Sequence, residues 1–567
     1  MKPFWVSFYS YKGGVGRSMA LANLAALLAL RGRRVFTIDF DLEAPGLDSF
    51  KELGIEAKKP GVVEYAHEFQ KTRIAPDLAP YIQECKFPKP LRGKVWLMSS
   101  GKKDESYNAK RIALNWEELY SSDLGEPFIA NWKAAIHRLF KPDYVFVDSR
   151  TGLTDVGGIC TLHLPDLVVL LFGLNDQNLH GTAAVLQTIR DAPSPRPPQV
   201  LPVATPVPDW PREEEGLLQA RFKAAEELLG LKIESVIHYN PYAALVEKLF
   251  TLESQSRGAQ NLLEEIKLKL PRSNPIAAEY AGLLEEILKR DEKGLDSLIR
   301  KAREACSKDD EATAIEVRQA LLDDFSDRAD ALFHVGQVDR LFRGREEAVE
   351  WWRKAIEAEP THQPAFEALV NHYKLKKQLD DVIALYTRRL EQTAKLDPDR
   401  SSAMQRELGE QLMVVGRYAD AARAYHGSLD EYGDQDADTR LVILFNLNES
   451  ERRRDCKPNT ELCRQLVNVW EKDITLQNQP LTLQANKLQA MHIPYACLGR
   501  LSIAKELLEK ARRCASAVGK IDRLFSVKTY TNVSVEEFVA ANDEMVSALD
   551  GLKLWDGMPL PAEKVSD

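Results

Sequence analysis

Cysteine is scarce in this chain of 567 residues, which contains only seven. No two of them have the spacing C-x-x-C, and no group of cysteines and histidines has the spacing of a zinc site, which excludes a disulfide framework and a structural zinc. An odd number of free, mostly buried thiols is typical of a protein in a reducing compartment. The cysteines are Cys85, Cys160, Cys306, Cys456, Cys463, Cys497 and Cys514.

Long hydrophobic runs are also missing. The longest apolar run, residues 19–30, is far shorter than the roughly 20 residues that a helix needs to cross a bilayer. The chain runs from its first residues into a predicted strand, so we expect no signal peptide. The acidic segment 533–567 contains no basic amphipathic helix that would hold a membrane surface. We therefore expect a cytoplasmic protein that binds no membrane.

The chain also lacks an excess of positive charge. The formal net charge is −9. Residues 1–255 hold 30 Lys and Arg against 31 Asp and Glu, which leaves 46 against 54 for the remainder. A protein that binds nucleic acid without regard to sequence would carry a basic excess, so nucleic acid is not a favoured partner.

The length exceeds what one hydrophobic core supports, and we expect two to four domains. With 44% hydrophobic and 28% charged residues, the composition is that of a globular protein. We predict four parts: an α/β domain over residues 1–255, a helical bridge over 256–328, an all-α repeat domain over 329–550 and a tail over 551–567.

The segment 11–18, Tyr-Lys-Gly-Gly-Val-Gly-Arg-Ser, is the most informative stretch. A strand-like run, 3–9, precedes it, and the Ala-rich run 19–30 after it is typical of a buried helix. Glycines let backbone N–H groups converge on one point, and the start of a helix adds the positive end of its dipole. This arrangement predicts a phosphate cradle. In such loops the hydroxyl at the position of Ser18 binds Mg²⁺.

Strand-like and helix-like runs alternate over the first 250 residues, and the strand-like runs are continuously apolar. This pattern predicts a doubly wound parallel sheet that helices cover on both faces. Ligands of such sheets bind at the carboxyl ends of the strands. The further predicted strands are 35–39, 95–99, 144–148, 167–172, 200–204 and 235–239, and the predicted helices are 129–139, 182–190 and 217–229.

Three carboxylates follow predicted strands at this edge of the sheet. Asp39 and Asp41 end the second strand, and Asp148 ends the strand 144–148, as in a Walker B motif. Phosphoryl transfer needs a carboxylate to position water and another near the metal, although a solvated surface turn would also explain the first pair. Arg150 adds a cation, which is either a partner of phosphate or of the acidic loop, or part of a plain structural salt bridge.

The pattern K-G-G-x-G-[K/R]-[S/T] resembles the ParA/MinD branch of P-loop ATPases, in the SIMIBI class, and within it a variant group with Arg in place of the loop lysine. The resemblance implies that Asp41 orients the attacking water and that Asp39 lies near the metal. It also implies that Lys12 reaches the phosphates of a second subunit in an ATP-bound homodimer. Where the family has Ser-Pro or Thr-Pro after the Walker B Asp, this chain has residues 149–152, Ser-Arg-Thr-Gly.

Arg17 replaces the lysine that bridges the β- and γ-phosphates. Arginine keeps the charge but is longer and planar, so the exchange is not conservative. We expect ATP to bind and its hydrolysis to be slow. In related proteins the loops after the late strands hold the base. In this chain the polar residues of these loops are either base contacts or ordinary loop residues. The expected nucleotide-binding residues are Lys12, Gly13, Gly14, Val15, Gly16, Arg17, Ser18, Met19, Asn175, Thr205 and Asn240. The expected catalytic residues are Lys12, Arg17 and Asp41, and those near Mg²⁺ are Ser18, Asp39 and Asp148.

Strand signals fade after residue 252. Amphipathic helical runs at 261–270, 276–290 and 295–304 form the predicted bridge, and a repeat follows. Its first copy has small and large residues at fixed offsets. A degenerate copy lies at 366–386, a clear third copy at 408–425, and residues 499–511 suggest a later one. This pattern resembles tetratricopeptide repeats, which stack helical hairpins into a solenoid that binds proteins; an irregular helical bundle is the alternative. The residues of the first copy are Gly336, Ala348, Trp352, Ala355 and Pro360.

Together these features predict an ATP-dependent, dimerising switch with slow hydrolysis, coupled to a protein-binding solenoid. Chains of this architecture resemble bacterial signalling or phage-defence components. The main alternative is a scaffold that binds ATP without turnover. A kinase is less favoured, because the last tyrosine is Tyr530 and no tyrosine-rich tail follows it. A partitioning ATPase is disfavoured because the basic patch is missing.

Overall fold

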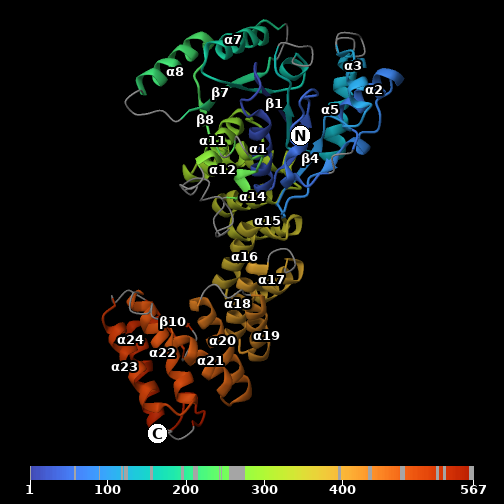
Figure 1. Ribbon diagram of the computed structural model, residues 1–567. Helices are drawn as coiled ribbons and strands as arrows, with labels where there is room; N and C mark the ends of the chain where they lie inside the picture. The colour runs from blue at the N-terminus through green and yellow to red at the C-terminus, as the bar shows by residue number, and fades with distance from the viewer. Residues whose placement is uncertain are drawn as a thin grey trace. The chain divides into compact units, whose positions relative to one another are not determined.

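The computed structural model describes residues 2–55, 59–88, 90–116, 119, 125–152, 158–192, 197–208, 215–241, 243, 246–253, 275–393, 398–431, 437–472, 479–518, 523–527 and 531–560. The chain forms two compact units, Met1–Ser326 and Asp327–Asp567. Figure 1 shows a sheet surrounded by helices in the first unit and successive helices in the second. No helix in these ranges combines the length and the apolar character that crossing a bilayer requires.

The first unit is built on one sheet of eight strands in the order β3-β4-β2-β5-β1-β6-β7-β8. All neighbours pair in parallel except the short edge strand β3, which is antiparallel to β4. The predicted parallel sheet is therefore confirmed, with one edge strand added. The strands are β1 (Phe4–Tyr9), β2 (Arg34–Asp39), β3 (Gln83–Glu84), β4 (Lys94–Met98), β5 (Tyr144–Asp148), β6 (Leu167–Phe172), β7 (Gln199–Val207) and β8 (Ser235–His238).

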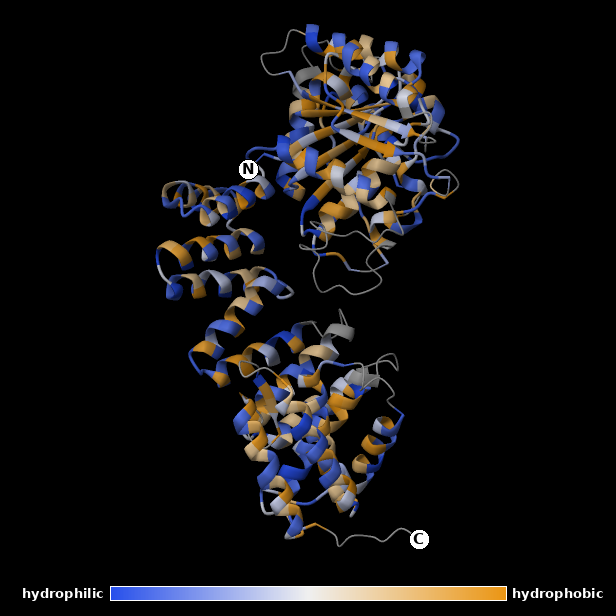
Figure 2. Cartoon of the chain, turned by 90° about the vertical axis from the view of Figure 1, so that its left-hand side faces the viewer, coloured by the Kyte–Doolittle hydropathy of each residue, from blue (hydrophilic) through white to orange (hydrophobic). Residues whose placement is uncertain are grey.

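The strands are apolar throughout because helices cover both faces of the sheet. Figure 2 shows the strands mostly in orange, with helices of mixed colour on either side. Val6 and Phe8 of β1 belong to a core with α1 and α11, whereas Trp5 joins a core with α2 and α5. The helices are α1 (Arg17–Leu30), α2 (Val62–Thr72), α3 (Tyr107–Ala113), α5 (Gly125–Phe140), α7 (Asp176–Asp191), α8 (Glu215–Leu229), α9 (Phe250–Glu253), α11 (Pro275–Arg290), α12 (Leu295–Ser307) and α13 (Glu311–Phe325).

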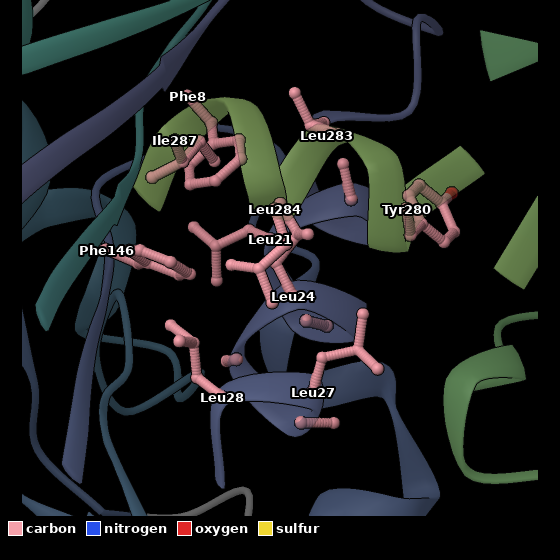
Figure 3. Packing of buried hydrophobic residues seen from close by; sticks show 14 of the residues in the cluster. Phe8, Leu21, Leu24, Leu27, Leu28, Phe146, Tyr280, Leu283, Leu284 and Ile287 are labelled. Atoms are coloured by element: carbon pink, nitrogen blue, oxygen red, sulfur yellow. The ribbon is translucent and has the colours of Figure 1, made fainter. Parts of the chain in front are cut away.

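Helix α1 is apolar on all sides, since the sheet covers one side of it and α11 another. In Figure 3, Leu21 and Leu24 of α1 belong to one cluster with the strand residues Phe8 and Phe146 and with side chains of α11. Leu283, Leu284 and Ile287 of α11 are fully buried in this core. Arg31 and Arg33 follow α1 and form ion pairs with Glu285 and Asp296, at 2.6 and 2.8 Å.

Helices α11 and α12 occupy part of the segment that the sequence assigns to a bridge, and both belong to the compact unit that contains the sheet. The predicted helix at 261–270 lies outside the described residues. The boundaries at residues 255 and 328 stay predictions.

The second unit consists of helices that pack against their neighbours in sequence, and of a short hairpin of β9 and β10. Most helices come in pairs joined by tight turns. Its elements are α14 (Ala329–Phe342), α15 (Arg345–Ala358), α16 (Gln363–Leu375), α17 (Leu379–Thr393), α18 (Pro398–Val414), α19 (Tyr418–Glu431), α20 (Ala437–Asp455), α21 (Thr460–Glu471), α22 (Leu481–Cys497), α23 (Leu501–Ser516), β9 (Arg523–Ser526), β10 (Thr531–Ser534) and α24 (Val535–Asp550).

Two helix pairs show the same close crossing. A Cβ on Gly336 of α14 would lie 2.6 Å from the Nε1 atom of Trp352 on α15. A Cβ on Gly409 of α18 would lie 2.7 Å from the ring of Tyr425 on α19. In each pair a large side chain fills the space that the missing Cβ leaves, and the two residues are the same distance apart in sequence. The predicted alternation of small and large residues is thus present in the packing.

Because His492 of α22 is buried, we expect the second unit to lose stability in acid. Burial lowers the pKa of His492 from 6.5 to about 4. Below pH 6.5 the unfolded chain binds a proton at His492, whereas the folded chain does not. The free energy of unfolding therefore falls as the pH falls. We expect His492 to contribute a loss of about 2 kcal/mol between pH 7 and pH 5.

Urea unfolding at both pH values measures this contribution, with the second unit followed by amide hydrogen exchange in α22. A His492→Gln variant should lose less stability than the parent protein on acidification. An equal loss in both proteins would exclude the proposed role of His492.

Candidate functional site

A glycine-rich turn connects β1 to α1 at the carboxyl edge of the sheet. Gly14 and Gly16 have φ angles of +81° and +82°, in the left-handed region that favours glycine. Gly16 is the N-cap residue of α1, and its carbonyl accepts a hydrogen bond of 2.9 Å from the N–H of Ala20. A Cβ on Gly13, Gly14 or Gly16 would meet no atom within 4 Å, so the turn faces open space.

Tyr11 stands where the general P-loop pattern has glycine, and its position explains the exchange. Its ring packs directly on Gly181 of α7: a Cβ on Gly181 would lie 2.1 Å from the ring. Tyr11 therefore attaches the turn to α7, and Gly181 provides the space for it.

Replacing Gly181 by alanine is expected to destabilise the first unit by about 1–3 kcal/mol, because the ring of Tyr11 must leave its site. Gly282→Ala in α11 is the matched control, since a Cβ there would meet no atom within 4 Å. Alanine at Gly282 should stabilise its helix by up to about 1 kcal/mol. Urea unfolding of both variants measures the difference, and equal effects would contradict the role given to Tyr11.

The predicted carboxylates lie together at the same edge of the sheet. Asp39 and Asp148 end neighbouring strands, in register, and both are fully buried. Asp39 accepts hydrogen bonds of 3.2 Å from the N–H groups of Asp41 and Leu47. The hydroxyl of Ser18, in the first turn of α1, donates to Asp148. The turn and the two strand ends thus form one polar site.

Burial dominates the electrostatics of this pair. It raises the pKa of Asp39 well above its usual value, and the neighbouring charge of Asp148 adds to the effect. Burial also raises the pKa of Asp148 to about 6, although Arg17 and Ser18 oppose the shift. Two buried carboxylates side by side are costly unless a cation balances them.

Arg17 provides that cation. Its Nη2 atom lies 2.8 Å from a carboxylate oxygen of Asp41, and its Nε atom lies 3.4 Å from Asp148. Its Nη1 atom donates to the hydroxyl of Ser10 at 2.6 Å. The Arg17 side chain is only 7% exposed. The sequence predicts Arg17 and Asp41 as site residues but does not indicate that they bind each other.

Lys12 is half-buried, and its ammonium group makes no hydrogen bond or ion pair with any described residue. Its backbone carbonyl accepts a hydrogen bond of 2.6 Å from the hydroxyl of Ser10. Ser10 therefore joins Lys12 to Arg17, a connection that the sequence analysis missed. The only signal in the sequence is the position of Ser10 between the strand and the glycines.

The residues predicted to contact a base have different surroundings. Thr205 adjoins the turn: its hydroxyl donates to the carbonyl of Val15 at 3.3 Å. The side chain of Asn175 caps α7 by accepting from the N–H of Asn178, at 3.0 Å. Asn240 accepts a hydrogen bond of 3.0 Å from the N–H of Ala243. Base contacts by these three residues stay predictions, and so does the role of half-buried Met19.

Arg150 binds the acidic loop that follows β2. Its guanidinium lies 2.7 Å from the carboxylate of Glu43, which also binds Arg111 at 2.9 Å. Of the interpretations open for Arg150 in the sequence, the structure shows a partnership with the acidic loop.

The donors fit a hard cation that arrives with phosphate. A hydroxyl and a buried carboxylate, those of Ser18 and Asp148, lie in contact. Within the described ranges no group of three or more His, Cys, Asp or Glu side chains is placed to hold a metal on its own. Mg²⁺ commonly binds through one or two protein oxygens, with water and substrate phosphates completing its shell.

A glycine turn between the first strand and first helix of a parallel sheet, with a Walker B carboxylate on the adjacent strand, defines a P-loop nucleotide-binding domain. Residues 6–203 match the family described as "CobQ/CobB/MinD/ParA nucleotide binding domain". This match covers part of the chain that contains the sheet, and it agrees with the resemblance of the glycine turn.

Solved structures of MinD and of a plasmid partition protein are similar to this chain. MinD from Pyrococcus horikoshii OT3, complexed with Mg-ADP, is 18% identical, with a TM-score of 0.35, and the match covers 50% of this chain and 96% of that one. MinD from Pyrococcus furiosus is 20% identical (TM-score 0.34), with 50% and 98% covered. A plasmid partition protein from Borrelia burgdorferi is 17% identical (TM-score 0.33), with 51% and 100% covered. No curated protein matches the chain.

Proposed function

We propose that this protein is an ATP-dependent switch that hydrolyses ATP slowly and that uses its helical unit to bind another protein. One observation carries the proposal: Ser18, Asp41 and Asp148 gather beside a glycine turn that faces open space. Such a turn at the start of a helix binds phosphate through backbone N–H groups.

Nucleotide and metal would bind at this edge of the sheet. The turn from Gly13 to Ser18 would hold the phosphates. Ser18 and Asp148 would hold Mg²⁺ directly or through water. Asp39, at the end of the neighbouring strand, would lie near the metal. Mg²⁺ would supply charge neutralisation of the phosphates. MinD from Pyrococcus horikoshii, with its Mg-ADP, supports this choice of ligands.

Hydrolysis would depend on Asp41. Its carboxylate is near the surface of the site, with the side chain 11% exposed, whereas that of Asp148 is fully buried. A carboxylate in this position can orient the attacking water. We expect the reaction to be slow because Arg17 replaces the lysine that usually bridges the phosphates, and arginine is longer and planar.

Two ATP-bound subunits would associate through the face that contains the turn. The ammonium of Lys12, which pairs with no residue that the structure describes, supports this, because a flexible point charge suits a contact that forms only when a second set of phosphates arrives. Association would then signal the nucleotide state to the helical unit.

The helical unit offers a defined place for a partner. A groove of about 500 Å³ lies between α18, α20, α22 and the β9–β10 hairpin. Val414, Val442 and Leu483 line it and are 38–47% exposed, which is unusual for side chains of this kind gathered at one place. The amide side chains of Asn446, Asn486 and Asn532 and the charged side chains of Glu410 and Lys487 interrupt the apolar lining.

This lining fits an extended segment of a partner protein whose side chains are mainly apolar. Apolar side chains would fill the groove, and amides can donate to and accept from a peptide backbone. The helix pairs support the wider assignment of this unit as a tetratricopeptide-like solenoid, whose stacked hairpins form a continuous surface.

Selection of peptides from a displayed random library against the full-length protein tests the groove. We expect the selected peptides to be apolar and to lose binding to a Leu483→Asp variant by at least about tenfold. Ile503→Asp on α23 is the matched control, because both side chains are 40% exposed and Ile503 does not line the groove. Peptides that bind both variants equally would refute this assignment.

A phosphate-release assay beside a nucleotide-binding assay tests the switch itself. The proposal predicts saturable binding of ATP with Mg²⁺, slow release of phosphate, and a doubling of mass with ATP. Binding of ATP without any phosphate release would instead favour a scaffold. The ion pair between Arg17 and Asp41 favours that second candidate, because it occupies the carboxylate that should orient water.

The biological role that the architecture implies is bacterial signalling or phage defence. Expression in a phage-sensitive bacterium tests the defence role. Fewer plaques with the parent protein than with an Asp148→Ala variant would support it, and equal numbers would count against it.

A further inference from the structure

Every nitrogen of the Arg17 guanidinium has a partner inside the protein. Nη2 binds Asp41, Nε binds Asp148 and Nη1 binds the hydroxyl of Ser10, at 2.8, 3.4 and 2.6 Å. These acceptors engage three of its five N–H groups, and the Arg17 side chain is only 7% exposed. The residue that the loop pattern assigns to phosphate is therefore held away from it.

The site needs this positive charge. Asp39 and Asp148 are fully buried, and Asp41 is 8% exposed. Removing the partner of a buried charge is strongly destabilising because the remaining charge is left uncompensated. A guanidinium suits the task better than an ammonium, since its planar fork presents N–H groups to several acceptors at once.

We propose that Arg17 is a two-position residue: in the nucleotide-free protein it serves as the internal cation of Asp41 and Asp148, and nucleotide binding releases it toward the phosphates. The inference rests on the proposed nucleotide function. It adds that nucleotide binding must break the ion pairs of Arg17 with Asp41 and Asp148. The binding-competent position of Arg17 is a minor state in the free protein, so the observed affinity is lower than the intrinsic one.

The inference explains why an arginine and Ser10 occur together. Ser10 accepts from Arg17 and donates to the carbonyl of Lys12, so the buried position of Arg17 is tied to the backbone of the turn. When Arg17 leaves, the hydroxyl of Ser10 loses one of its two partners and keeps the carbonyl of Lys12. The turn thereby responds to the same event that frees Asp41 for water.

Titration of the full-length protein with fluorescently labelled ADP in EDTA tests the inference without catalysis. Asp41→Asn should tighten ADP binding by about fivefold or more, because it weakens the hold on Arg17. The matched control is Asp296→Asn, which breaks the ion pair between Asp296 and the buried Arg33, beyond the other end of α1. This variant should bind ADP with unchanged affinity.

Removing a negative charge near phosphate would also tighten binding, and a double variant separates the two causes. If Arg17 is the released group, Asp41→Asn should give no gain in an Arg17→Gln background. A gain that persists there would overturn the inference in favour of simple charge removal. Unchanged affinity in the Asp41→Asn single variant would show that Arg17 stays in place and would also overturn it.

Thermal unfolding without nucleotide provides a second readout. Arg17→Gln should lower the unfolding temperature by several degrees, because it leaves Asp41 and Asp148 without their cation. An unchanged temperature would contradict the internal-cation role. Failure of the parent protein to bind ADP would refute the proposed function itself, whereas binding that Asp41→Asn leaves unaltered refutes only this inference.

Discussion

Replacing Asp41 by alanine is expected to lower the rate of phosphate release at least about a hundredfold and to leave ATP bound. The side chain of Asp41 is 11% exposed, whereas the other two acids of the site, Asp39 and Asp148, are fully buried. Without it no group orients the attacking water, but the backbone of the turn still holds the phosphates. Single-turnover phosphate release measures the first effect, and calorimetric titration measures the second.

Asp104→Ala is the control for this variant. Asp104 lies on the loop after β4, is partly exposed and forms an ion pair with Lys102 at 3.2 Å. Its removal should change the rate by less than about threefold, as for surface pairs in general. Should Asp41→Ala release phosphate as fast as the Asp104→Ala control, another group would orient the water.

Replacing Lys12 by alanine is expected to abolish ATP-dependent association. The parent protein, at 64.0 kDa per chain, should double its mass with ATP and Mg²⁺, and the variant should not. The reason is that Lys12 has no partner among the described residues of its own chain and is positioned beside the open turn. Light scattering with ATP, with ADP and without nucleotide measures the mass.

Lys103→Ala serves as the matched control. Lys103 is a lysine with 40% exposure that binds Asp48 at 2.6 Å, outside the turn. The Lys103→Ala variant should associate like the parent protein. A Lys12→Ala variant that still doubles its mass with ATP would remove Lys12 from the subunit contact and leave its role within one chain.

The sheet could be predicted from sequence because its strands are buried on both faces and are therefore apolar without interruption. β3 could not, since two residues, Gln83 and Glu84, carry no pattern. The position of α11 was also inaccessible: its charged, amphipathic sequence indicates a helix but not the surface that the helix covers. Only the structure shows that it covers α1.

The candidate site was predictable as a set of residues but not as a network. Motif and spacing identify Ser18, Asp39 and Asp148, and the structure brings them together. Charge chemistry gives two acceptable partners for Arg17, a phosphate and a carboxylate. The choice between them depends on the register of β2 with β5, which the sequence does not contain.

The repeats show the opposite case, in which spacing alone predicts a contact. Gly336 and Trp352 lie sixteen positions apart in sequence, as do Gly409 and Tyr425, and both pairs meet at a close helix crossing. In any such hairpin a large ring fills the space that the missing Cβ of a glycine leaves. The spacing of the two residues therefore predicts their contact without other information.

Calorimetric titration of the full-length protein with ATP and Mg²⁺ tests the central claim most directly. The account predicts saturable binding of one ATP per chain, and a strong loss of affinity when Gly16 is replaced by valine, which its φ angle of +82° does not allow without strain. Absence of binding by the folded parent protein would contradict the account, because the turn and its carboxylates would then have no ligand.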